Sequence, residues 1–163
     1  MIVVSDTTPL ISLLKIKRIG LLEKLFGEVV IPQAVFTELT VDIRFAEEAE
    51  VIKNEKFISV KEVSNMASVN ILKRATGLDQ GESEAIILSD EIQADILLMD
   101  EAKGRKISDQ MGIHIMGTIG ILMVAYEDDI LTADEVKKCI DGLQNAGRHI
   151  GHKHYQMLLD LLK

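Results

Sequence analysis

Two aspartates in this sequence follow short apolar runs, and each precedes a stretch with helical character. Asp6 comes after Ile2–Val4 and a serine, and Asp100 comes directly after Ile96–Met99. Such runs predict buried strands of a parallel sheet, and α/β proteins bind ligands beyond the carboxyl ends of those strands. Either Asp could instead cap the next helix. This alternative is weaker for Asp6, because Thr8-Pro9 supplies a cap residue followed by a proline that suits the first helical position.

Two glutamates share helical faces with apolar residues. Glu38 follows an Ala and a Val by four and three residues, so it extends their apolar face or lies at its rim. Glu82 precedes an Ala and an Ile by three and four residues, although its place in a first helical turn would also suit the helix dipole. Asp79 is the expected cap of that helix, which would leave Glu82 available, and Glu84 is expected to be a solvated charge.

The four acids Asp6, Glu38, Glu82 and Asp100 would repel one another if they met at one sheet edge. Protonation, basic partners or a cation would have to neutralise them. Sets of ligands made only of oxygen suit hard cations, so Mg²⁺ or Mn²⁺ is the natural interpretation. Such an ion lowers the pKa of a bound water and stabilises a leaving oxygen, which suits phosphodiester hydrolysis.

Strands and helices alternate along the chain, which predicts βαβ units and a mainly parallel sheet of an α/β protein. Residues 62–76 have the weakest pattern and are expected to form an exposed loop or a loose helix. No linker divides the chain. The expected strands are 2–4, 29–31, 57–60, 96–99 and 113–115, and the expected helices are 9–26, 33–40, 44–55, 80–93, 101–110, 118–127, 132–145 and 152–162.

Composition narrows the functional classes. The 163 residues suit one domain, and 26 acids against 18 bases give a net charge of -8, which excludes a broadly basic nucleic-acid-binding surface. The single Cys139 excludes a disulfide framework, and its helical spacing predicts core packing. No apolar run reaches about 18 residues and Met1 leads directly into a strand, so we expect a soluble cytoplasmic protein that is not bound to a membrane.

Several segments, in their order and spacing, resemble those of a PIN domain. The opening Val4-Ser5-Asp6-Thr7-Thr8-Pro9-Leu10-Ile11 resembles the first PIN element, and the segment around Glu38 resembles the second. The tail resembles that of a subfamily of small bacterial and archaeal PIN proteins that are similar to VapC-type toxins. The segments that carry the resemblance are 4–11, 30–39, 78–86, 94–105, 112–122 and 146–159.

The resemblance implies a three-layer α/β/α sandwich with a central parallel sheet of about four or five strands. It would span 1–163 as one PIN-like domain, with 132–163 as a C-terminal helical extension. It further implies a Mg²⁺- or Mn²⁺-dependent endoribonuclease acting on single-stranded RNA. Many members of the family are toxins held by a small antitoxin protein, and homodimers are common.

The acids of the family map onto the same four residues. The resemblance implies that Asp6 and Asp100 bind metal directly, and that Glu38 and Glu82 bind it through water or orient the nucleophile. Thr118, after a glycine at a helix start, could bond a carboxylate or a substrate phosphate, or serve as a plain cap. Arg105 could contact substrate phosphate or pair with the Glu four residues before it.

Two alternatives remain open at this point. A phosphohydrolase with Asp6 as nucleophile usually needs a second Asp two residues later, and this chain has Thr8 there. A non-catalytic PIN-like module would bind RNA or a protein without cutting. This second alternative rests on Glu82, because many PIN nucleases carry Asp at that position and the extra methylene moves the carboxylate by about a bond length.

The C-terminal tail is mildly basic. His149, His152 and His154 match no standard zinc spacing and are expected to be solvated. With Arg148 and Lys153 they form a tail that could touch RNA or a partner.

Overall fold

A computed structural model describes residues 1–162, and within them five strands form one parallel sheet. The strand order is β3-β2-β1-β4-β5, with every neighbouring pair parallel. The first strand of the chain therefore lies in the middle of the sheet, and the parallel pairing confirms the predicted βαβ pattern. The strands are β1 (Val3–Ser5), β2 (Val29–Pro32), β3 (Ile58–Lys61), β4 (Ile96–Leu98) and β5 (Ile115–Met116).

Helices fill most of the remaining chain, and a short 3₁₀ turn, Ile43–Phe45, joins two of them. The α-helices are α1 (Thr7–Lys15), α2 (Gly20–Phe26), α3 (Gln33–Val41), α4 (Ala46–Asn54), α5 (Met66–Thr76), α6 (Gln80–Glu91), α7 (Ala102–Gln110), α8 (Thr118–Glu127), α9 (Ala133–Asn145) and α10 (His152–Leu161). None of the helices described is long and apolar enough to cross a membrane.

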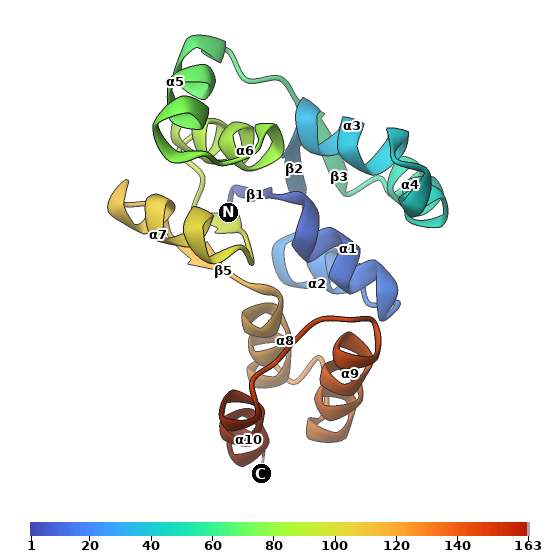
Figure 1. Cartoon of the computed structure of the whole chain (residues 1–163). Helices are drawn as coiled ribbons and strands as arrows, with labels where there is room; N and C mark the ends of the chain where they lie inside the picture. Colours follow the sequence, from blue (N-terminus) through green and yellow to red (C-terminus); the bar gives the residue numbers. More distant parts are fainter. Residues whose placement is uncertain (163) are drawn as a thin grey trace.

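The sheet is covered on both faces, which confirms the predicted α/β/α sandwich. Successive residues of a strand point to opposite faces. Val4 and Leu97 accordingly join the apolar cluster beneath α5, α6 and α7, while Val3 and Leu98 join the cluster beneath α1 and α2. Figure 1 shows α5 and α6 on one side of β1 and α1, α2 and α8 on the other. Strands β1, β2 and β4 are mostly buried and therefore rich in apolar residues, whereas the edge strand β3 is partly exposed.

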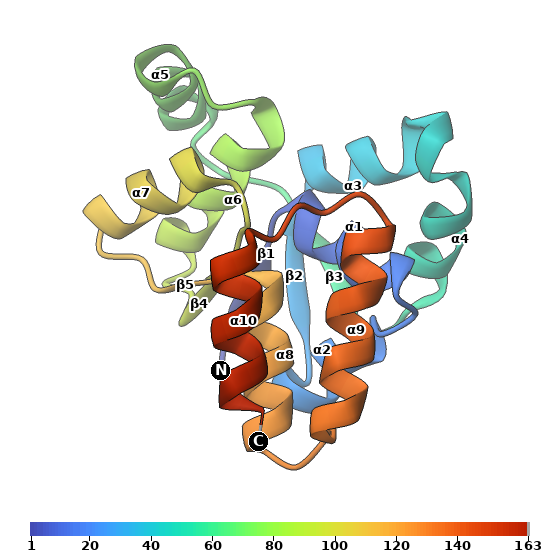
Figure 2. The ribbon, with the colours of Figure 1, turned by 60° about the horizontal axis from the view of Figure 1, so that its bottom comes forward.

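The last two helices pack on other helices and not on the sheet: α9 contacts α8 and α1, and the cluster they share includes Leu21 of α2. One face of α9 carries Val136, Cys139, Ile140 and Leu143, all buried in a cluster with Leu158 of α10. Figure 2 shows α8, α9 and α10 next to one another along the same side of the molecule. The prediction that Cys139 is a core residue is confirmed.

The helix expected over 9–26 is wrong in two respects. It begins at Thr7, which places Asp6 and not Thr8 at the cap position, and it is broken between α1 and α2. Lys17 adopts a left-handed conformation with φ 57°, and Arg18 N donates to Leu13 O at 2.8 Å. This is a Schellman ending with Lys where glycine is usual, so the customary sequence signal for the break is missing.

Two other segments are defined more closely by the structure. Of the two alternatives for 62–76, an exposed loop or a loose helix, the structure has a mostly exposed helix, α5, which Asn65 caps and Gly77 ends in the left-handed conformation. The last strand lies at Ile115–Met116 and not at 113–115, because a turn of the chain at Gly112, with φ 76°, delays its entry into the sheet.

Candidate functional site

The two predicted aspartates lie at the point where the direction of strand succession reverses. Strands β2 and β3 lie on one side of β1, and β4 and β5 lie on the other. Asp6 follows β1 directly, and its backbone N–H donates to Leu98 O at the end of β4 at 2.9 Å. Asp100 follows two residues after Leu98. Open α/β sheets bind ligands at such a switch point.

Asp6 is a buried carboxyl, only 3% exposed. It occupies the cap position of α1, yet its side chain makes no capping hydrogen bond. Its pKa is raised from 3.8 to about 7, mainly by burial and further by the nearby charges of Glu82, Asp79 and Glu38, against the lowering effect of the Thr7 amide. The group therefore resists ionisation unless a positive charge joins it.

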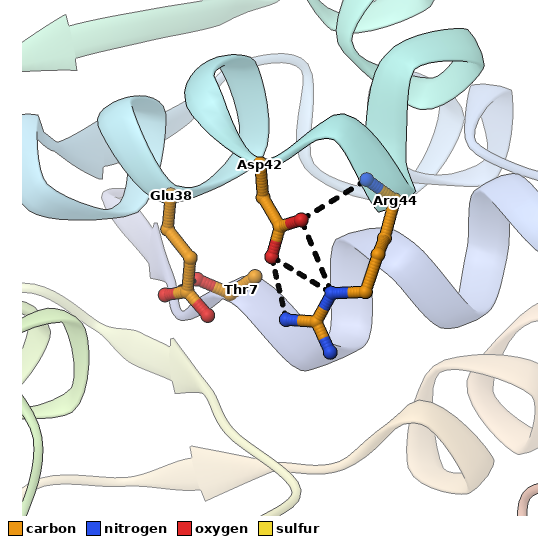
Figure 3. Close-up of polar contacts among 4 residues, drawn as sticks. All are labelled: Thr7, Glu38, Asp42 and Arg44. Atoms are coloured by element: carbon orange, nitrogen blue, oxygen red, sulfur yellow. Dashed lines mark hydrogen bonds and ion pairs between the residues drawn. The ribbon is translucent and has the colours of Figure 1, made fainter.

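Glu38 reaches the site from α3, although the residue as a whole is exposed. Its Oε2 accepts a hydrogen bond from Thr7 Oγ1 at 2.8 Å, and both residues appear together in Figure 3. Gly81 lies opposite: a Cβ added there would be 3.1 Å from Glu38 Oε2. The close approach of α3 and α6 therefore brings this carboxylate to the sheet edge from the rim of its helix.

An ion pair at the end of α3 lies beside Glu38 and was not predicted. Arg44 Nη2 lies 2.5 Å from Asp42 Oδ2, and Arg44 Nε and its backbone N–H also bond the same carboxylate (Figure 3). Asp42 raises the pKa of Arg44, with a smaller contribution from Glu38. The pair depends on a local turn after the helix. In the sequence, the only sign of this ion pair is that an acid and a base stand two residues apart.

Asp79 caps α6, as predicted, and Glu82 completes a capping box with it, so one oxygen of Glu82 is engaged within the protein. Asp79 Oδ1 accepts from Glu82 N at 2.8 Å, and Glu82 Oε2 accepts from Asp79 N at 2.9 Å. The Asp-x-x-Glu spacing was a readable signal for this reciprocal pair. Burial raises the pKa of Glu82, with Asp79, Glu101 and Glu38 adding to the effect.

Glu84 is buried, so the prediction of a solvated charge is wrong. It is 5% exposed and accepts from Ala34 N at 3.2 Å and from Gln80 Nε2 at 2.6 Å. Ala34 is in the first turn of α3, where backbone N–H groups lack partners within their own helix. Glu84 therefore ties the start of α3 to α6, a contact that exists only because the two helices pack together.

Asp100 is bound to the start of α8, and its side chain is 8% exposed. Thr118 donates its backbone N–H to Oδ1 at 2.7 Å and its hydroxyl to Oδ2 at 2.5 Å. Arg148 Nη1 lies 3.3 Å from Oδ2. The following helix, α7, is capped by Glu101, whose Oε2 accepts from Gly104 N at 2.7 Å. Asp100 is therefore not needed as the cap of α7.

The two predicted substrate-binding residues both lie next to Asp100. The Thr118 hydroxyl bonds a carboxylate, which is one of the interactions expected for it. Arg105 lies across Gly117 from Asp100: a Cβ on that glycine would be 2.6 Å from Arg105 Nη1 and 2.9 Å from Asp100 Oδ1. Arg105 and Asp100 also line a common pocket.

Comparison with known families identifies the chain. The family model DUF3368, described as a PIN domain, matches residues 2–163. The chain belongs to the PIN domain family. PIN domains are generally nucleases and typically use divalent metals. A comparison with curated proteins found no match.

The acids of this PIN domain suit a divalent cation in kind, because every donor is an oxygen. The side chains are nevertheless turned to protein partners, and no group of three His, Cys, Asp or Glu residues within 1–162 is arranged to hold an ion. An ionised carboxylate has about four lone-pair sites, so the bonds to Glu82 and Asp100 leave capacity for a further partner. Buried, uncompensated Asp6 is the observation that most favours a cation here.

Proposed function

We propose that this PIN domain is a Mg²⁺- or Mn²⁺-dependent endoribonuclease that hydrolyses phosphodiester bonds of single-stranded RNA. The carrying observation is the arrangement around Asp6. A carboxyl with a pKa raised to about 7 lies at the switch point of the sheet, and three further acids raise that pKa by their charge. Such an accumulation is costly without a cation. Membership in a family of nucleases supports the same conclusion.

The chain's own residues have separate tasks in this proposal. Asp6 and Asp100 would hold the metal, with Glu38 and Glu82 holding it through water. When bound, such an ion lowers the pKa of a water molecule and stabilises the leaving oxygen. Thr118 fixes the Asp100 carboxylate, which explains its two short hydrogen bonds, and Arg105 contacts substrate phosphate.

Cleavage of single-stranded RNA tests the proposal directly. We expect the wild type to cut in Mn²⁺ or Mg²⁺ and to stop in EDTA, and we expect Asp6→Asn and Asp100→Asn to reduce the rate at least 100-fold. Asp90→Asn is the matched control, because Asp90 is an exposed acid on α6 away from the sheet edge. Undiminished cleavage by both site variants would contradict the assignment.

A second candidate is a PIN-like module that binds RNA or a protein without cutting. It is favoured by the hydrogen bonds that already engage Glu82 and Asp100 within the protein. Thermal melts with Mn²⁺ separate the two. A metal-dependent nuclease gains stability from the ion, about 2.7 kcal/mol at 100 times the dissociation constant. A non-catalytic module shows no such gain and no cleavage.

We further propose that the protein acts in the cytoplasm as the toxin of a toxin–antitoxin pair and forms a homodimer. Exposed apolar side chains support a partner chain: Val41 is 75% exposed and Ile43 is 89% exposed, both near the end of α3. Expression should arrest growth, and co-expression of a small protein encoded next to it should relieve the arrest. Light scattering of the purified protein measures its mass and tests the dimer.

A further inference from the structure

A pocket of about 600 Å³ opens beside Asp100, outside the cluster of acids around Asp6. Its size suits a nucleotide-sized group and not a folded partner. One wall comes from α7 and the start of α8, and the other from the arm 146–151 that joins α9 to α10, visible in Figure 2. The lining includes one acid, Asp100, and the basic residue types Arg105, Arg148, His149 and His154. This concentration is unusual in a chain with net charge -8.

Arg148 anchors the arm to the site through one nitrogen. Its Nη1 lies 3.1 Å from Ser12 Oγ and 3.3 Å from Asp100 Oδ2. A guanidinium has five N–H donors, and within residues 1–162 no contact engages Nε or Nη2. The side chain is 34% exposed, so these donors are open to a ligand.

Gly117 keeps Arg105 next to the same carboxylate. Any side chain at this position would collide with Arg105 Nη1 and with Asp100 Oδ1. The two arginines therefore approach Asp100 from different elements, Arg105 from α7 and Arg148 from the arm. The backbone and hydroxyl of Thr118 already offset part of the Asp100 charge, which lessens its repulsion of an incoming anion.

We propose that Arg105 and Arg148 form a phosphate-binding site that holds the RNA strand at the phosphate next to the one that is cut. The proposal rests on the proposed function and adds a role for the C-terminal arm. Guanidinium groups bind phosphate oxygens through paired hydrogen bonds, and two of them from separate walls fix the direction of a strand. In a protein whose overall charge repels RNA, these local contacts supply the attraction.

Binding is measured with a fluorescent single-stranded RNA in the Asp6→Asn background, where cleavage is blocked. We expect Arg105→Gln and Arg148→Gln each to weaken binding about tenfold. Each should also lower the slope of log K against log salt by about 0.7, the value for one lost phosphate contact on a single strand. Arg74→Gln, at an exposed arginine on α5 that does not line this pocket, should change affinity less than about twofold.

Arg148 also holds the arm, so its loss could act through structure. Arg148→Lys keeps the positive charge at this position, and thermal melts of every variant show whether its fold is intact. Arg105→Gln does not touch the contacts that hold the arm. Unchanged RNA affinity in both Gln variants would overturn the site. Inorganic phosphate serves as competitor: displacement of RNA at equal concentration would assign the pocket to free phosphate and overturn the strand assignment.

The outcomes separate this site from the proposed function. If the wild type cuts RNA and both Gln variants bind RNA normally, the phosphate site is wrong and the nuclease stands. If the wild type never cuts RNA but both Gln variants lose affinity and salt slope, the nuclease is wrong and the phosphate site stands.

Discussion

At the scale of single residues, the central feature is a carboxyl that is buried with no positive partner among residues 1–162. Asp6 is 3% exposed, and the structure surrounds it with other acids. In water an Asp gives up its proton far below neutral pH. Here the folded protein holds that proton up to about pH 7, so its stability depends on pH through this group.

Asp6→Asn should remove that dependence. The folded-state pKa of Asp6 is raised from 3.8 to about 7, so the native state binds the proton more tightly than the unfolded chain does. Stability from this group is therefore present at pH 4 and is lost as pH rises toward 8. We expect Asp6→Asn to be more stable than wild type by about 2–4 kcal/mol at pH 8 without metal, and nearly equal at pH 4.

Circular-dichroism melts in EDTA between pH 4 and pH 8 measure this difference. Asp90→Asn, an exposed acid, should follow the wild type at every pH. A constant offset between Asp6→Asn and wild type across the range would show that Asp6 ionises normally.

Gly117→Ala adds one carbon atom between Arg105 and Asp100 and therefore tests whether their close approach matters. The added Cβ would lie 2.6 Å from Arg105 Nη1 and 2.9 Å from Asp100 Oδ1, so both groups must move. We expect RNA cleavage to fall at least tenfold, with a loss of about 1–3 kcal/mol in stability from overpacking. Gly20→Ala is the control, because a Cβ there meets nothing within 4 Å. Equal rates for the two variants would mean that the Arg105–Asp100 arrangement does not matter for cleavage.

At the scale of elements, two helices, α6 and α9, both begin with a capping box, but only the box of α6 lies at the candidate site. Asp79 and Glu82 form a capping box on α6 at the site, and Thr132 and Glu135 form one on α9 away from it. Removing either cap exposes first-turn N–H groups of its helix. Only the α6 box also holds a proposed metal ligand.

Asp79→Ala and Thr132→Ala should therefore differ in function but not in stability. Each should cost about 1 kcal/mol in the free energy of unfolding. Asp79→Ala should also change Mn²⁺ affinity, because it removes the carboxylate that accepts from the Glu82 backbone N–H and whose charge acts on Asp6. Denaturant titration measures the first effect, and calorimetric Mn²⁺ titration measures the second. Equal Mn²⁺ affinity in the two variants would show that the Asp79 carboxylate does not contribute to the metal site.

Most of the fold could be predicted from local pattern, and the failures are instructive. The parallel sheet and the later helices follow apolar periodicity, because burial dictates it. The break between α1 and α2 could not be predicted, since Lys17 takes a conformation for which glycine is the usual signal. The helix α5 is mostly exposed, with Val69 its one fully buried residue among those described, so it carries little apolar pattern.

The site residues that follow strand ends could be predicted from the sequence. The contacts that depend on the packing of distant elements could not. Asp6 and Asp100 follow strands, and parallel strands present their carboxyl ends together. Glu84 and Arg148 gain their partners only when distant elements meet, at Ala34 and at Asp100. Glu82 is an intermediate case. The Asp-x-x-Glu spacing indicates a capping box, but only the role of Asp79 as the cap was predicted from it.

At the scale of the whole molecule, the C-terminal helices are connected to the sheet through α8. Ile121 of α8 belongs to the cluster under the sheet, while Leu122 belongs to the cluster of α9 and α10. One helix therefore contributes to both cores. If 132–163 is an extension of a single domain, loss of packing at its far end should destabilise everything at once.

Leu158→Ala tests this, because Leu158 on α10 is 4% exposed within the C-terminal cluster. We expect a loss of about 2–5 kcal/mol in a single transition. The chain has no Trp, and its two tyrosines, Tyr126 and Tyr155, both pack against this cluster. Tyrosine fluorescence thus reports the C-terminal cluster to which α8, α9 and α10 contribute, while circular dichroism reports all helices. Coincident curves would confirm one cooperative unit. Met157→Ala, an exposed neighbour, should change little. A fluorescence transition that precedes the circular-dichroism transition would instead mean that the C-terminal cluster unfolds separately from the sheet and its candidate site.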